Sequence, residues 1–306
     1  MSPSQLRGVI AASATPVRDD FSPDTTRLVP HLRKLLDGGC DAINLLGTTG
    51  EANSFGLHDR LGIMRAVKEA GLPMERFMVG TGVCSLQETV TLTHAADELG
   101  FAGALVLPPF FYPGIEPDAL LAYVEALVER LKPLRLALYL YHIPQNTKVP
   151  WPVEVVAELA RKHAGVLRGI KDSAGDLAYS RAVVAAAPNL DVFPSSEAVL
   201  FEAGQDGFAG CISATINLTA ADCQVAWSHQ GGPQGKEAVA RATAQRGILG
   251  KQALVASVKA ALSVLYGDAQ WARTCPPLLP RTAQQTEALA AELRAAGLAL
   301  PEPAVA

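Results

Sequence analysis

Long apolar runs and an excess of basic residues are both missing from this sequence of 306 residues. No window reaches about eighteen uninterrupted apolar residues, and Met1–Val9 lacks the apolar run of a secretory signal, so we expect a cytoplasmic protein without membrane spans. The formal net charge of -4 provides no overall basic field for phosphate backbones. Nucleic acid is therefore not an expected partner.

Paired cysteine motifs and a glycine-rich nucleotide turn are missing as well. Five cysteines are an odd number for a disulfide framework and show no CxxC spacing, so we interpret all of them as free thiols: Cys40, Cys84, Cys211, Cys223 and Cys275. The first apolar run leads into Ala14-Thr15-Pro16-Val17 without the GxGxxG pattern that doubly wound dinucleotide-binding sheets usually carry.

Eight short apolar runs alternate with helical patterns along the chain. The runs are Val9–Thr15, Ala42–Gly47, Phe77–Thr81, Gly103–Pro108, Leu136–Ile143, Val166–Lys171, Asp191–Pro194 and Gly207–Ala214. Runs that are apolar on both faces and joined by helices predict a parallel sheet covered by helices. Eight repeats favour an α/β fold of the (β/α)8 TIM barrel type, which typically takes about 250 residues.

The chain continues past this barrel with further helical patterns. We expect residues 1–217 to form the barrel and residues 218–306 to form its last helix and a C-terminal helical extension. The extension is amphipathic, which suits packing against the barrel or another subunit better than a flexible linker. We expect the last residues, Leu298 to Ala306, to be loose.

Lys171 ends the sixth apolar run and is the first candidate for chemistry. Strand alternation places it on the same side as Leu167 and Gly169, at the carboxyl end of the barrel where active sites lie. Only a neutral amine attacks a carbonyl, and a free lysine has a pKa of about 10.4, so a Schiff-base lysine needs a desolvated setting. The alternative is a solvated lysine or an ion pair with Asp172 or Asp176.

Two neighbouring segments supply further candidates. Alternation along Tyr139-Leu140-Tyr141-His142 turns Tyr141 toward Lys171, where a phenol can transfer protons, and turns His142 away, which indicates a structural role for the histidine. A core tyrosine is the alternative. The turn Gly47-Thr48-Thr49-Gly50-Glu51 offers amides and hydroxyls to a small carboxylate, although an ordinary turn fits the local sequence too. A phosphate cradle is disfavoured because the P-loop lysine is missing.

Taken in order, Gly47-Thr48-Thr49-Gly50-Glu51, Tyr141-His142-Ile143-Pro144 and Gly169-Ile170-Lys171-Asp172 resemble the dihydrodipicolinate synthase / N-acetylneuraminate lyase family. The resemblance covers nearly the whole chain. It implies an imine between Lys171 and pyruvate or another 2-keto acid, a carboxylate held by Gly47, Thr48 and Thr49, and proton transfer by Tyr141 with Thr48. It also implies a role for the Ile212 carbonyl near the lysine. The reaction then needs no metal, nicotinamide or thiamine. Because members of the family are typically tetramers built as dimers of dimers, the resemblance also implies a homotetramer or a dimer.

Departures from the family's synthases concern the distal end of the substrate. Asn146 stands where the synthases have an arginine for the aldehyde's carboxylate, Phe111 where a neighbouring subunit supplies a tyrosine, and Ala52 where serine is usual. An amide cannot give the charged, bidentate grip of an arginine. We expect the distal pocket to be built from Phe111, Tyr112, Gln145, Asn146 and Ser173.

The leading hypothesis is an aldolase that acts on a 2-keto-3-deoxy sugar acid or 4-hydroxy-2-oxoglutarate. A dehydratase or deaminase that uses the same imine, a dihydrodipicolinate synthase and a non-catalytic ligand-sensing barrel are alternatives, and a phosphate-binding isomerase is disfavoured by the missing phosphate turn. Neutral hydroxyaldehydes such as glyceraldehyde are expected to condense with pyruvate faster than aspartate semialdehyde does.

Overall fold

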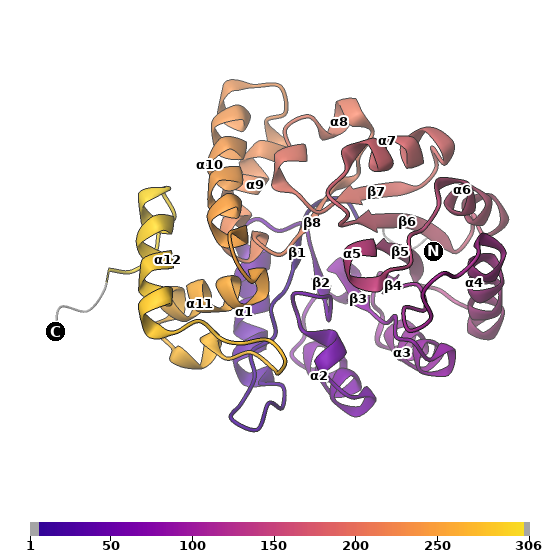
Figure 1. The fold of residues 1–306 in the computed structure, drawn as a ribbon, viewed down its shortest axis with the longest axis horizontal. Helices are drawn as coiled ribbons and strands as arrows, with labels where there is room; N and C mark the ends of the chain where they lie inside the picture. The colour runs from indigo at the N-terminus through magenta and orange to yellow at the C-terminus, as the bar shows by residue number, and fades with distance from the viewer. Residues whose placement is uncertain (1–5, 303–306) are drawn as a thin grey trace.

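Eight parallel strands form the centre of the protein in the computed structural model, which describes residues 6–302 (Figure 1). Their hydrogen-bonded order is β7-β6-β5-β4-β3-β2-β1-β8, and the Ala209 amide donates to the Val192 carbonyl at 2.9 Å between β7 and β8. The predicted TIM barrel is confirmed. The strands are β1 (Gly8–Ala12), β2 (Ala42–Leu45), β3 (Phe77–Gly80), β4 (Gly103–Val106), β5 (Ala137–His142), β6 (Leu167–Asp172), β7 (Asp191–Pro194) and β8 (Gly210–Ser213).

Helices cover the outside of the barrel, and several helices of the chain begin at a side chain that caps them. Asp24, Ser85, Asp176 and Thr282 each accept a hydrogen bond from an amide of the first helical turn that follows, which satisfies a donor without a partner inside the helix. The helices around the strands are α1 (Thr25–Asp37), α2 (Leu57–Glu69), α3 (Leu86–Leu99), α4 (Pro117–Leu131), α5 (Pro144–Thr147), α6 (Val153–Lys162), α7 (Leu177–Ala186), α8 (Ala203–Asp206) and α9 (Ile216–Ser228).

Strand alternation divides the core into an outer layer and a filled barrel interior. On β5, Leu138 and Leu140 pack outward against the helices, whereas Tyr139 and Tyr141 point inward. Tyr139 fits inside because its neighbours on β4 and β6 are glycines: a Cβ on Gly103 or Gly169 would lie 2.7 or 2.8 Å from its ring. The interior is therefore packed around Tyr139, below the carboxyl ends of the strands.

The C-terminal helices gather on one side of the barrel, next to α1 (Figure 1). They are α10 (Pro233–Gly250), α11 (Leu254–Tyr266) and α12 (Ala283–Ala295). Their shared core includes Leu300, which is only 8% exposed, and the Leu298 amide donates to the Leu293 carbonyl at 2.9 Å. The expectation of a loose end is wrong for residues 298–302, because these leucines bury apolar surface against α12. Residues 303–306 lie outside the described part.

The cysteines are all unpaired, as predicted; Cys84 is exposed and the other four are buried. Within residues 6–302, no single helix is long and apolar enough to cross a membrane. The helices α10 and α11 reach the length and apolar composition of a membrane span only when taken together, and they are bent by 112° relative to each other.

Candidate active site

A cavity of about 340 Å³ opens among residues at the carboxyl end of the barrel, where the sequence places the candidate site. Lys171 and Tyr141 lie in its wall, together with both threonines of the β2 turn. The predicted site residues that line it are Thr48, Thr49, Tyr141, Gln145, Asn146, Lys171, Ser173 and Ile212. The structure thus brings together side chains from β5, β6, β8 and the loops that follow β2, β5 and β6.

Lys171 and Tyr141 face each other across the boundary between β6 and β5. They are partners in the strand register, and the Lys171 Nζ lies 4.3 Å from the centre of the Tyr141 ring. Their exposed fractions are 3% and 4%. The proposed ion pair with Asp172 or Asp176 is not found within residues 6–302, because Asp172 accepts from Ala174 and Ser180 and Asp176 caps α7.

The Tyr141 hydroxyl is the centre of a small polar network. It is hydrogen-bonded to the Thr48 hydroxyl at 3.2 Å and accepts a long hydrogen bond from the Ser173 hydroxyl at 3.4 Å. Burial by itself would raise the pKa of Tyr141, but the charge of Lys171 and the hydrogen bonds from Ser173 and Thr48 lower it below that of a free phenol. A phenol with a lowered pKa is better suited to transferring protons near neutral pH.

His142 supports the strand behind Tyr141 and does not face the cavity. Burial lowers its pKa to about 4, so the ring is neutral at pH 7. Its Nδ1 accepts from the Trp151 amide at 3.1 Å, and its ring stacks on Tyr179 with 4.0 Å between centroids. The Trp151 indole in turn donates to the Tyr141 carbonyl at 3.2 Å, so this cluster holds the backbone of the candidate proton-transfer residue.

The turn after β2 is held by a buried ion pair that links it to α11. Leu46 and Glu51 bound the turn in left-handed conformations, with φ of 52° and 54°. The Glu51 carboxylate pairs with Lys259, and both side chains are fully buried. Its other oxygen accepts from the Cys275 amide at 2.7 Å. The backbone that presents Thr48 and Thr49 is therefore fixed by the C-terminal part of the chain.

Removing one charge of this pair should destabilise the protein strongly. We expect Glu51→Leu to lower the free energy of unfolding by about 3–5 kcal/mol, because Lys259 remains buried without its counter-charge, and Glu51→Leu/Lys259→Met to recover much of the loss. Urea unfolding measures both. Glu292→Ala removes the exposed pair with Lys251 and should cost at most about 1 kcal/mol. Equal losses in Glu51→Leu and Glu292→Ala would contradict this role of the buried pair.

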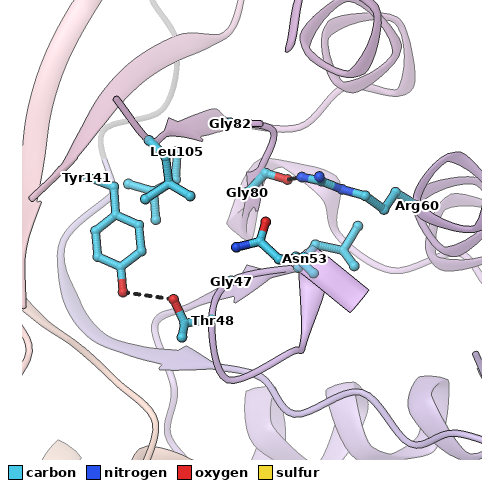
Figure 2. Close-up of a pocket in the computed structure, with 11 residues that line it drawn as sticks. Gly47, Thr48, Asn53, Arg60, Gly80, Gly82, Leu105 and Tyr141 are labelled. Carbon is cyan, nitrogen blue, oxygen red and sulfur yellow. Dashed lines mark hydrogen bonds between the residues drawn. The ribbon is translucent and has the colours of Figure 1, made fainter. Parts of the chain in front are cut away.

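A second, much smaller cavity lies behind Thr48 and Tyr141 (Figure 2). Its volume of about 20 Å³ suits water more than a substrate. Figure 2 shows Asn53 between the Thr48–Tyr141 pair and Arg60, whose Nη2 donates to the Gly80 carbonyl at 2.8 Å. Burial lowers the pKa of Arg60 to about 10. Gly47, predicted to bind the substrate's carboxylate, lines this smaller cavity.

Two predicted residues lie away from the cavity, and two polar residues that line it were not predicted. Phe111 and Tyr112 are 73% and 70% exposed and contact each other edge-on, on the loop between β4 and α4. Arg246 and Ser195 line the larger cavity and were not predicted from the sequence. No motif marks Arg246, since it lies in the last turns of α10 and reaches the site through tertiary packing.

The protein is a TIM barrel with a buried lysine in the cavity at the carboxyl end of its strands. The family model for the dihydrodipicolinate synthetase family matches residues 5–296, and the chain belongs to this family. The resemblance inferred from the three motifs is thereby confirmed.

Curated relatives and solved structures agree with this assignment over nearly the full length. The chain is 32% identical to an uncharacterized DapA-like lyase of Chloroflexus aurantiacus, covering 94% of this chain and 96% of the relative. It is 30% identical to a 4-hydroxy-tetrahydrodipicolinate synthase of Kineococcus radiotolerans, covering 96% and 94%. Dihydrodipicolinate synthase from Agrobacterium tumefaciens, at 26% identity and a TM-score of 0.86, covers 94% of this chain and 98% of its own.

Proposed function

We propose that the protein is a Schiff-base-dependent aldolase that cleaves or forms the carbon–carbon bond between pyruvate and an aldehyde. The proposed substrate is a 2-keto-3-deoxy sugar acid or 4-hydroxy-2-oxoglutarate. The observation that carries the proposal is the buried Lys171 amine, which faces the Tyr141 ring in a cavity that also holds Thr48 and Thr49. Assembly as a homotetramer or dimer, in the cytoplasm, belongs to the same proposal.

The proposed cleavage begins with the attack of the neutral Lys171 amine on the keto carbon. Loss of water from the resulting adduct, with one proton supplied by the Tyr141 phenol, gives a protonated imine and leaves Tyr141 as a phenolate. Thr48 and Thr49 hold the adjacent carboxylate. Tyr141 takes the proton from the hydroxyl two carbons away, the carbon–carbon bond breaks, and its electron pair moves to the imine nitrogen as an enamine. After the aldehyde leaves, Tyr141 returns the proton to the enamine carbon. Water then hydrolyses the protonated imine to pyruvate and the free Lys171 amine, and the released proton restores the Tyr141 phenol.

A dehydratase or deaminase is the second candidate, because elimination of the hydroxyl from the same substrate starts from the same imine. What separates the two outcomes is which bond the Tyr141 proton transfer assists. A synthase acting on aspartate semialdehyde is less favoured, because Asn146 lies in the cavity wall in place of the family's arginine. A ligand-sensing barrel is less favoured because Lys171, Tyr141 and Thr48 are all present. The Lys171 amine contacts the Tyr141 ring, and the Tyr141 hydroxyl is hydrogen-bonded to Thr48.

Product analysis on a panel of 2-keto-3-deoxy acids tests the proposal. We expect pyruvate and an aldehyde to appear in equal amounts, because bond cleavage yields one of each per imine formed. Chromatography with mass detection measures both, and a no-enzyme sample is the control. Loss of water with no pyruvate would replace the aldolase by the dehydratase. Rapid condensation of pyruvate with aspartate semialdehyde, compared with the best aldehyde, would restore the synthase.

A further inference from the structure

We propose that Arg246 binds a second carboxylate at the far end of the substrate, so that the natural substrate is a 2-oxo acid with a carboxylate at both ends. This inference rests on the proposed aldolase function. It names the substrate class for the site that contains Lys171, and it assigns to a residue of α10 the specificity role that Asn146 cannot fill.

Arg246 is placed to meet the end of the substrate that is not bound to Lys171. Its side chain lines the same cavity as Lys171 and Tyr141. It also lines an adjoining cavity of about 300 Å³, whose wall shares Ser173 and Ser195 with the first. The lining of the larger cavity within residues 6–302 includes two cationic side chains and no acidic one. Because Lys171 is used for the imine, Arg246 is the cation that remains for another anion.

The guanidinium is held from behind and keeps one edge free. Its Nη1 donates to Glu197 at 3.0 Å, to Ser213 at 2.8 Å and to Thr215 at 3.2 Å. Glu197 is fully buried on the short helix η3 (Glu197–Val199), against which α10 packs. The Nε and Nη2 groups donate to no residue of the described chain, and 27% of the side chain is exposed. A planar guanidinium with two free parallel donors is the group that matches a carboxylate.

The charge around Arg246 favours a carboxylate over a phosphoryl group. Glu197 already balances the guanidinium charge at hydrogen-bonding distance. A carboxylate adds one negative charge, which the free Nε and Nη2 donors can share, whereas a phosphoryl group adds nearly two beside the buried Glu197. A neutral hydroxyl or methyl end would leave these donors to water. The ranking from sequence, with neutral hydroxyaldehydes ahead of aspartate semialdehyde, is thereby revised in favour of aldehydes that carry a carboxylate, aspartate semialdehyde included.

Cleavage of a matched pair of substrates tests the inference. 4-Hydroxy-2-oxoglutarate ends in a carboxylate, and 4-hydroxy-2-oxopentanoate replaces that carboxylate with a methyl group. We expect kcat/KM for pyruvate release to favour the first by about 10–100-fold, as a charge-assisted bidentate contact allows. In Arg246→Met this ratio of kcat/KM values should fall to within about threefold, mostly because kcat/KM for the dicarboxylate decreases. Arg246→Lys should retain part of the preference.

Two further variants keep the test decisive. Arg241→Met removes an arginine of the same helix that pairs with Asp222 on the surface, and it should leave the preference unchanged. If Arg246→Met fails to fold because Glu197 is left unpaired, Arg246→Met/Glu197→Gln removes both charges together. A preference that persists in Arg246→Met or in Arg246→Met/Glu197→Gln, or a wild-type enzyme that cleaves both substrates equally, would overturn the inference. So would wild-type preference for 2-keto-3-deoxy-6-phosphogluconate over the dicarboxylate.

Trapping of pyruvate with borohydride distinguishes failure of this inference from failure of the proposed function. Arg246→Met should still form the reduced adduct on Lys171, because pyruvate has no distal carboxylate. If the wild-type protein forms the adduct and releases pyruvate without distinguishing the matched pair, the role of Arg246 is wrong and the aldolase stands. If the wild-type protein forms no adduct, the aldolase itself is wrong.

Discussion

Replacing Lys171 with alanine should abolish both the capture of pyruvate and the release of pyruvate from any substrate. The wild-type protein treated with pyruvate and borohydride should gain one reduced pyruvyl group per chain, at Lys171. In Lys171→Ala we expect no adduct and a fall in turnover of at least about 10³-fold, because no other amine replaces the covalent step. Intact-protein mass spectrometry and peptide mapping measure the adduct.

A neighbouring lysine provides the control for this experiment. Lys148 is exposed near the mouth of the site, where its Nζ donates to the Gln145 carbonyl, and its φ of 57° is a conformation that asparagine tolerates. The Lys148→Asn variant should form the reduced pyruvyl adduct and turn over substrate to the same extent as the wild-type protein. Undiminished labelling in Lys171→Ala, or an unmodified Lys171 in the wild-type protein, would overturn the proposed mechanism.

Tyr141→Phe should keep the fold and lose most of the turnover. The ring that lies over the Lys171 Nζ is retained, whereas the hydroxyl that is bonded to Thr48 and Ser173 is removed. We expect kcat to fall by roughly 10²–10⁴-fold, the usual contribution of a positioned proton-transfer group, while borohydride still traps some pyruvate. Steady-state kinetics and adduct mass measure the two effects separately.

Tyr139→Phe is the matched control, because Tyr139 lies two residues earlier on the same strand and also points into the barrel. It lies below the cavity wall rather than in it, so its loss of a hydroxyl should leave kcat within about twofold while changing stability by about 1 kcal/mol. Comparable losses of kcat in the two variants would return Tyr141 to the role of an ordinary core tyrosine.

The barrel could be predicted from the sequence because each of its strands and helices is marked by a pattern of neighbouring residues. Each strand is a short apolar run and each surrounding helix has a repeating apolar face, and these patterns persist whatever the rest of the chain does. The packing of the chain end from Leu298 onward was not predicted, because the partners of Leu300 lie on α11 and α12 and no local pattern connects them to it.

The candidate site was predicted where strand geometry fixes it. Alternation alone turns Tyr141 and Lys171 inward, and adjacent parallel strands bring them together, which is where the structure places them. Phe111 and Tyr112 were expected at the distal pocket, but their loop is not constrained by any register. In this chain they extend into solvent.

By itself, the sequence determined the strand and helix order, the barrel and the inward side chains of β5 and β6, because 2-residue and 3.6-residue periodicities are set by backbone geometry. Only the tertiary structure decided which distant residues complete the cavity. Arg246 reaches it because α10 packs on η3, where Glu197 fixes the guanidinium, and Lys259 reaches Glu51 because α11 folds back on the β2 turn. Both pairings join charges far apart in the chain, and their partners are selected by three-dimensional packing and burial, which no sequence period encodes.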